Sequence, residues 1–209
     1  MSLTLYTVGH STQTCDAFVS LLTAHQITAV ADVRSTPYSR RNPQFNRDDI
    51  RATLKSSSIQ YAFMGKELGA RSNDDGCYVN DKIRYSMLAQ TSLFKSGIER
   101  LLEGARSHRI ALMCAEKDPL HCHRTILVSR ELVLRGANIL HILSDGAIET
   151  HDEALRRLVR CLKLDGEDLF RSEGVTLEEA YERQGNLIAY DRSVHRAPVR
   201  DAANETEVS

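Results

Sequence analysis

Short apolar runs recur along most of the chain and are separated by segments of mixed polarity. The runs at residues 27–33 and 109–113 are nearly continuous, which is typical of parallel strands covered on both faces. Shorter runs at residues 3–8, 59–64 and 138–143 are rich in residues that favour strands. The pattern therefore predicts five strands.

Apolar residues at helical spacing lie between these predicted strands. Thr14, Asn46 and Ser92 are polar residues that suit the first position of a helix. Residues 65–84 are expected to form a loop. The predicted helices cover residues 14–25, 48–54, 92–102, 122–134 and 151–162.

The alternation of strands and helices, about five times, predicts an α/β fold. Its sheet should be mostly parallel and sandwiched by helices. We expect one domain over residues 1–164 and a partly helical C-terminal extension over residues 165–192. The polar segment at residues 193–209 is expected to be a disordered tail.

Composition and charge limit the class of protein. Of 209 residues, 42% are hydrophobic and 26% charged, an ordinary balance for a globular protein. The net charge of −1 excludes a broadly basic nucleic-acid coat but not a local basic patch. No long apolar run or signal peptide is recognised, and five irregularly spaced cysteines do not suggest a disulfide framework. We therefore expect a cytoplasmic protein without a membrane partner.

Three polar segments follow strands that should end at one edge of the sheet. They lie at residues 9–11, 32–34 and 114–124. Ligands of open parallel sheets bind at the carboxyl ends of the strands. The sequence therefore predicts a site where these segments meet.

Cys122, His123 and Arg124 are expected to begin a helix at this edge. Free N–H groups and the helix dipole would attract an anion there and lower the pKa of a thiol. Cys122 is then a candidate nucleophile, His123 a catalytic residue and Arg124 an anion-binding residue. A buried structural role for Cys122 and a capping role for His123 remain open.

Arginines on the second loop suggest the kind of ligand. Arg34 and Arg40 suit phosphate, and Phe45, expected to be exposed, suits a base. The ligand would be an anionic, phosphorylated or nucleotide-like molecule, or a nucleic-acid fragment. Pairing of these arginines with carboxylates of the protein is the alternative.

His10 and Glu116 are candidates for proton transfer. His10 follows the first strand, and Glu116 lies in the turn between two cysteines. We expect Asp32, Ser11 and Cys114 to support the site, although Cys114 could equally be a small buried residue.

A zinc site is a weaker alternative. Cysteine and histidine are suitable ligands, but the spacing lacks a Cys-x2-Cys pair, and adjacent residues such as Cys122 and His123 rarely face one ion. We therefore assign neither a metal nor a cofactor. The residues available for this alternative are Cys114, His121, Cys122, His123 and His10.

Four motifs together resemble the bacterial domain-of-unknown-function family numbered 488. The resemblance spans residues 3–143, and residues 179–184 are similar to the family's C-terminal extension. It implies no activity. The motifs are Thr-Val-Gly-His-Ser at 7–11, Asp-Val-Arg-Ser at 32–35 with residues 39–45, Glu-Leu-Gly at 67–69, and Cys-Ala-Glu at 114–116 with Cys-His-Arg at 122–124.

A weaker likeness is to rhodanese-like domains and cysteine-dependent phosphatases. It rests on the strand, cysteine, loop and helix around Cys114. Those proteins place an arginine six residues after the cysteine. Here that position is Leu120 counted from Cys114, or Val128 counted from Cys122.

The sequence leaves three functions open. The first is an enzyme acting on a phosphorylated or nucleotide-like substrate at the Cys/His/Arg site. The second is a nucleic-acid-associated module without catalysis. The third is a metal-binding structural or sensory domain.

Overall fold

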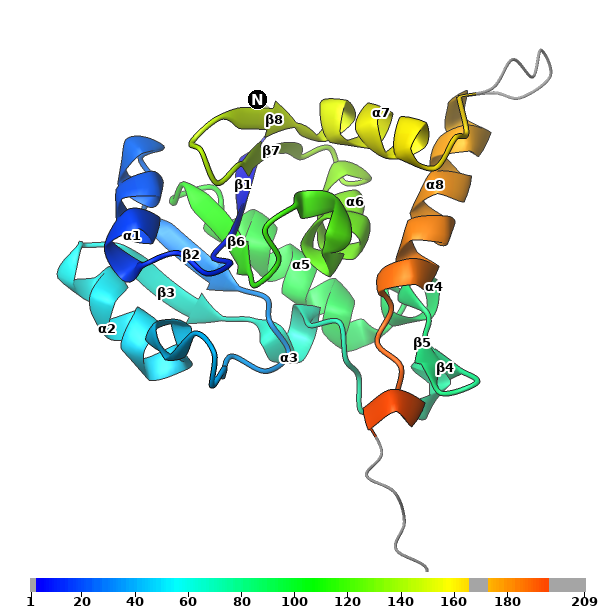
Figure 1. The fold of residues 1–209 in the computed structure, drawn as a ribbon, viewed down its shortest axis with the longest axis horizontal. Coiled ribbons are helices and arrows are strands. Elements are labelled where there is room, and N and C mark those ends of the chain that lie inside the picture. Colours follow the sequence, from blue (N-terminus) through cyan, green and yellow to red (C-terminus); the bar gives the residue numbers. More distant parts are fainter. Residues whose placement is uncertain (1–2, 166–172, 196–209) are drawn as a thin grey trace, which may run out of the picture.

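The computed structural model describes residues 3–165 and 173–195 (Figure 1). Its centre is a six-stranded sheet with the order β3-β2-β6-β1-β7-β8. The first five of these strands are parallel, and β8 is antiparallel to β7. The strands are β1 (Thr4–Gly9), β2 (Ala29–Asp32), β3 (Gln60–Phe63), β6 (Ile110–Cys114), β7 (Asn138–Ile142) and β8 (Ile148–Thr150). The predicted α/β fold is confirmed.

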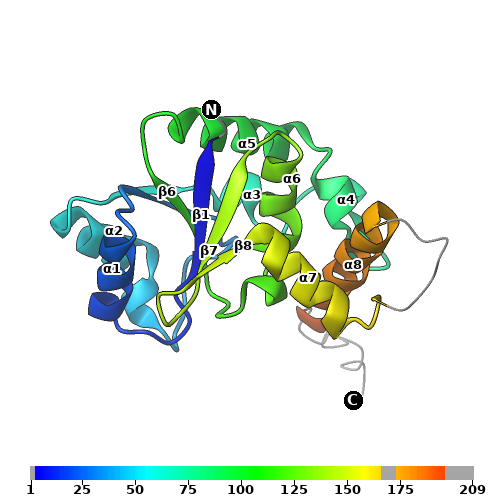
Figure 2. The same ribbon diagram turned by 90° about the horizontal axis from the view of Figure 1, so that it is seen from above.

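Helices cover both faces of this sheet (Figure 2). On one face, α1 (Cys15–Ala24) and α2 (Arg47–Ser56) pack on Tyr6, Val8 and Met113. On the other face, side chains of α3, α5 and α6 share a core with Leu5, Leu112 and Cys114. These three helices are α3 (Gly65–Leu68), α5 (Ser92–Gly104) and α6 (Arg130–Val133).

Several local predictions were wrong. Residues 65–84 are not simply a loop, because they contain α3 and the hairpin strands β4 (Tyr78–Val79) and β5 (Lys82–Ile83). A short helix that was not predicted, α4 (Tyr85–Leu88), follows. The cap of α5 is Thr91 rather than Ser92, since the Thr91 side chain accepts from the N–H of Phe94. Strand β8 was also missed; it is only three residues long.

The helix predicted at residues 122–134 differs most. Cys122 is extended, with φ −137° and ψ 141°. A π-helical segment, Arg124–Ser129, comes first and passes into α6. The Ser129 hydroxyl donates to the carbonyl oxygen of Arg124 at 2.7 Å, which satisfies one acceptor of this wider turn. The helical residues begin at His123, and the carbonyl oxygen of Cys122 accepts from the N–H groups of Thr125 and Ile126 at 3.1 and 3.2 Å. Cys122 therefore caps the N-terminus of this segment, as the sequence predicted.

The C-terminal extension packs on the domain through α8 (Glu173–Ile188), which contacts α7 (His151–Cys161), the last helix of the domain. Ala180 and Tyr181 of α8 share an apolar cluster with Leu155, Leu158 and Leu120. The short 3-10 helix Ser193–His195 follows, and the rest of the predicted tail lies outside the described residues. Within the described ranges, no helix has the length and apolar character needed to span a membrane.

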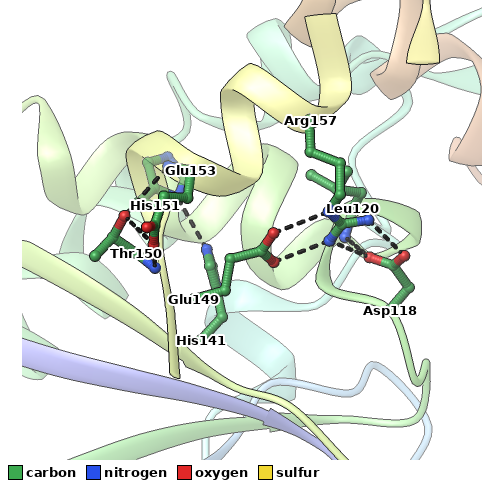
Figure 3. Close-up of polar contacts among 8 residues, drawn as sticks. All are labelled: Asp118, Leu120, His141, Glu149, Thr150, His151, Glu153 and Arg157. Carbon is green, nitrogen blue, oxygen red and sulfur yellow. Dashed lines mark hydrogen bonds and ion pairs between the residues drawn. The ribbon is translucent and has the colours of Figure 1, made fainter. Parts of the chain in front are cut away.

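A buried polar chain connects the extension to the sheet. His141 of β7 is hydrogen bonded to His151 of α7 at 3.1 Å (Figure 3). On its other side, His141 is hydrogen bonded to the Thr7 hydroxyl at 2.8 Å. The other ring nitrogen of His151 is 2.8 Å from the Tyr181 hydroxyl. Burial lowers the pKa of both histidines, that of His151 from 6.5 to about 4. The folded protein therefore holds both rings neutral.

We predict that acid weakens folding through these two rings. A neutral buried histidine contributes fully above the unfolded pKa of 6.5, and this contribution is lost as the pH falls toward the folded pKa, about 4 for His151. At pH 5 the loss should be on the order of 1–2 kcal/mol for His151, and His141 should add to it in the same direction. Denaturant unfolding at pH 7 and pH 5 measures it. His151→Gln should flatten the dependence, whereas equal free energies of unfolding for the native protein at both pH values would contradict the prediction.

Candidate functional site

The three predicted strand ends do meet at one edge of the sheet. Gly9 of β1 pairs with Cys114 of β6, and Asp32 of β2 pairs with Met113. Beyond the strands, the N–H of His10 donates to the Cys114 carbonyl at 3.0 Å. The expected convergence of these segments is confirmed.

The side chains, however, form two groups on opposite faces of the sheet. Neighbouring residues of a strand alternate between faces, so Asp32 shares a face with its partner Met113 while Cys114 points to the other. The arginine–aspartate group lies on the Met113 side and comprises His10, Asp32, Arg34, Phe45 and Tyr61. The thiol–histidine group lies on the other side and comprises Cys114, Cys122 and His123.

Asp32 is the centre of the arginine–aspartate group. Its buried carboxylate accepts from Arg34 at 2.6 and 2.8 Å and from the Tyr61 hydroxyl at 2.7 Å. Arg34 also donates to the Phe45 carbonyl at 2.9 Å and is only 6% exposed. The guanidinium is therefore held by the protein itself.

His10 is also held on both sides. Its Nε2 lies 3.1 Å from the Arg34 guanidinium, which can only donate, so Nδ1 carries the proton and donates to the Ser11 carbonyl at 2.9 Å. Burial, and then the charge of Arg34, lowers the pKa of His10 to about 4. The ring stacks on Phe45 with centroids 4.2 Å apart. The expectation that Phe45 is exposed was wrong, because it is fully buried against His10 and Phe18.

Arg40 lies apart from both groups. It is exposed on the loop after β2, next to exposed Arg41 and near Tyr38, whose side chain is 64% exposed. The two predicted anion-binding residues of this loop are thus separated, one buried at the sheet edge and one facing solvent.

The thiol–histidine group brings two sulfurs to one imidazole nitrogen. Nδ1 of His123 lies 3.8 Å from Sγ of Cys114 and 3.8 Å from Sγ of Cys122. Its Nε2 lies 3.0 Å from the Val33 carbonyl oxygen. Since that oxygen can only accept, Nε2 carries a proton and Nδ1 faces the sulfurs.

Adjacent residues converge here because the backbone changes conformation between them. Cys122 is extended, whereas His123 has helical angles of φ −61° and ψ −23°. In a continuous strand the two side chains would point to opposite sides. Because of this change of conformation, the side chains of Cys122 and His123 can face the same ion although the two residues are adjacent in the sequence.

The two thiols differ in protonation. The pKa of Cys114 is raised, because its S–H is held by the Cys122 sulfur and because it is buried. Burial opposes ionisation of Cys122 as well, but the hydrogen bond from Cys114 and the charge of Arg124 outweigh it and lower the pKa of Cys122. Cys122 is therefore the sulfur of the pair that ionises more readily. All five cysteines of the chain are free.

Arg124 supports the loop between the two cysteines. Its side chain is 1% exposed and donates to the carbonyl oxygens of Glu116 at 2.7 Å and Lys117 at 3.3 Å. A further bond reaches the Thr7 hydroxyl at 3.4 Å. Because these donors have protein partners, Arg124 acts on the site through the loop and through its charge.

A second clamp holds the far end of the same loop (Figure 3). Asp118 accepts from the N–H of Leu120 at 2.9 Å, and its carboxylate accepts two bonds from Arg157 at 2.8 and 3.0 Å. Arg157 also binds Glu149 of β8 through two bonds. From α8, Gln184 donates to the Leu120 carbonyl at 2.8 Å.

A cavity of about 420 Å³ opens beside the thiol–histidine group. Glu116, exposed in the turn as predicted, lies in its wall together with His121, Arg71 and Tyr85. Further lining residues come from the end of α8 and the segment after it, from Ile188 to Asp191 with Val194. Arg71, Tyr85 and this wall were not predicted from the sequence. Arg71 lies only two residues after the motif at 67–69, but Tyr85 and the wall lie outside the motifs.

One family model matches this chain. Its description is Domain of unknown function DUF488, and the match covers residues 14–130. This confirms the resemblance that the four motifs predicted; the likeness to rhodanese-like domains stays a prediction. No curated protein and no solved structure matches the chain.

We predict that Gly9→Ala disturbs the loop. A Cβ at Gly9 would lie 1.9 Å from the Glu116 carbonyl oxygen, so the turn between the cysteines would have to move. The free energy of unfolding should fall by about 1–3 kcal/mol, measured by denaturant unfolding. Gly174→Ala is the control, because no residue that the structure describes lies within 4 Å of where its Cβ would be, and its effect should stay below about 1 kcal/mol. Equal stability of native protein and Gly9→Ala would contradict the close approach.

Proposed function

The chain belongs to the family of domains of unknown function DUF488, and we propose that it is an enzyme-like domain that binds a small anionic ligand beside Cys122. The ligand would occupy the cavity of about 420 Å³, within the size range of small-molecule sites. Cys122 would be the reactive group: its sulfur would form a bond to an electrophilic centre of the ligand while the bond from that centre to a leaving group breaks, and the leaving group would depart through the cavity.

The observation that carries this proposal is the thiol–histidine group in the cavity wall. Its two sulfurs and one imidazole nitrogen come from the end of β6 and from the turn before the π-helical segment. Hydrogen bonds from Arg124, Asp118 and Gln184 fix the intervening loop. A nucleophile held in place beside a cavity is what covalent catalysis requires.

Cationic and polar groups of the cavity favour an anionic ligand. Arg71 lies in the wall with its guanidinium 4.3 Å from the centre of the Tyr190 ring. His121 is exposed in the same wall. Arg71 is therefore the residue we assign to the anion, and Glu116 is the nearby group for proton transfer. Arg71 takes the anion-binding role that the sequence predicted for Arg34 and Arg124, because the N–H donors of those two arginines are bound to acceptors of the protein.

A second function has one observation in its favour. Tyr38, Arg40 and Arg41 are exposed together on the loop after β2. An exposed aromatic ring beside two arginines suits a nucleic-acid strand, through stacking and phosphate contacts. On this alternative the protein would be a nucleic-acid-associated module, and the cavity would play no part.

Removing charge from the cavity wall or from the loop after β2 distinguishes the enzyme-like function from the nucleic-acid-associated one. We expect phosphate or a nucleoside monophosphate to bind the native protein, and Arg71→Gln to weaken this about tenfold through loss of a charge-assisted contact. The double variant Arg40→Gln, Arg41→Gln removes more charge from the other surface and should bind as the native protein does. Calorimetric titration with these ligands and with a short oligonucleotide measures both.

The opposite result would favour the alternative. If oligonucleotide binding is lost only in the Arg40, Arg41 variant, and no mononucleotide or phosphate binds, the ligand site is on the loop after β2. Melting curves of both variants establish that they are folded.

Thiol labelling tests the role of Cys122. Cys122 and Cys77 are equally inaccessible, at 2% and 1% exposure, but only Cys122 lines the cavity beside a histidine. A small haloacetamide should therefore label Cys122 in the folded protein at least about tenfold faster than Cys77. Peptide mass spectrometry gives both rates, with exposed Cys161 as the fast reference.

A bound anion should slow the labelling of Cys122 without changing that of Cys161. The nucleophile role is overturned if Cys122 and Cys77 react at the same slow rate until the protein unfolds.

A further inference from the structure

We propose that Cys114, Cys122 and His123 hold a zinc-type divalent ion whose fourth coordination position faces the cavity. The inference rests on the proposed function for the location of the ligand. The inference goes beyond the proposed function by naming a metal ion as the group that would hold the anion. When this ion is bound, the two sulfurs would be metal ligands rather than reactive groups.

The distances within the thiol–histidine group fit such an ion. The three candidate ligand atoms lie within 4.8 Å of one another, and Nδ1 is 3.8 Å from each sulfur. Zinc bonds of about 2.3 Å to sulfur and about 2.0–2.1 Å to nitrogen place tetrahedral neighbours about 3.6 Å apart. The two distances from Nδ1 to the sulfurs are therefore already close to those of a tetrahedral site.

His123 is oriented as a metal ligand usually is. Its Nε2–H is donated to the Val33 carbonyl at 3.0 Å, which leaves the Nδ1 lone pair pointing toward the two sulfurs. Metal-bound histidines commonly donate their second nitrogen to a backbone carbonyl or carboxylate in this way. The bond to Val33 thus fixes both the tautomer and the direction of the ring.

The ligand types select the class of metal. Two thiolates and an imidazole suit zinc and related transition metals, whereas magnesium and calcium require oxygen ligands. Three protein ligands with one open position are the composition of catalytic zinc sites; structural sites are closed by a fourth ligand. All three residues line the cavity, so the open position is accessible to a ligand.

An ion would also bring positive charge to the cavity beside the thiol–histidine group. The guanidinium of Arg124 is only 1% exposed and does not line this cavity. A divalent ion balances two thiolates and offers its fourth position directly to the anion. The metal would then bind the ligand that the proposed function places in the cavity.

Cobalt(II) is the probe that tests this inference, because thiolate-bound tetrahedral cobalt has intense visible and near-ultraviolet absorption. Full-length, fully reduced protein should develop these bands and saturate at one cobalt per chain, and zinc should abolish them. Cys114→Ser and Cys122→Ser should each weaken binding at least about a hundredfold, since removing even an outer partner typically costs ten- to a hundredfold. Cys77→Ser and Cys161→Ser are the matched controls and should bind as the native protein does.

Labelling of the native protein provides a measurement that needs no variant. Zinc should protect Cys114 and Cys122 from a haloacetamide while Cys161 reacts as before. The inference is overturned if reduced, folded protein gives no saturable cobalt bands, or if the bands survive in both serine variants.

The failure of this inference can be told from failure of the proposed function. Rapid labelling of Cys122 and anion binding in a protein that takes up no cobalt would overturn the metal and support the nucleophile. Stoichiometric cobalt binding without anion binding, and without preferential labelling of Cys122, would support the metal and overturn the function.

Discussion

The buried guanidinium of Arg124 holds the first part of the loop that separates the two cysteines of the site. Arg124 reaches from the π-helical segment to the carbonyl oxygens of Glu116 and Lys117. Its charge also contributes, after the hydrogen bond from Cys114, to lowering the pKa of Cys122. The loop and the readiness of one sulfur to ionise therefore both depend in part on the same side chain.

The place of the site could be predicted from the sequence, because it follows from the direction of parallel strands. Once residues 9–11, 32–34 and 114–124 are assigned to strand ends, they must lie at one edge of the sheet. Which of them share a face could not be assigned in the same way. That depends on strand register: Asp32 pairs with Met113 rather than with Cys114, and a shift of one residue would exchange the faces.

The details of the reactive group depend on local backbone changes that leave little trace in the sequence. The change from extended Cys122 to helical His123 brings neighbouring side chains together. The spacing of apolar residues predicts a helix through both, since the pattern of residues 122–134 is helical. Likewise, Arg34 and Asp32 lie only two positions apart in the sequence and form an ion pair. Whether the Arg34 side chain bends back to Asp32 or extends into solvent depends on the packing around it, which the sequence pattern does not show.

The wall of the cavity opposite the sulfurs comes from the segment after α8, which lies outside the part of the chain that matches the family model. The N–H of Ile83 donates to the Tyr190 carbonyl at 2.9 Å and seats that wall against β5. The reactive side chains and this part of the surface that a ligand would meet therefore belong to stretches of sequence that can diverge independently. A relative could keep the sulfurs and the histidine unchanged while exchanging the residues after its last helix, and selectivity would then evolve without altering the chemistry.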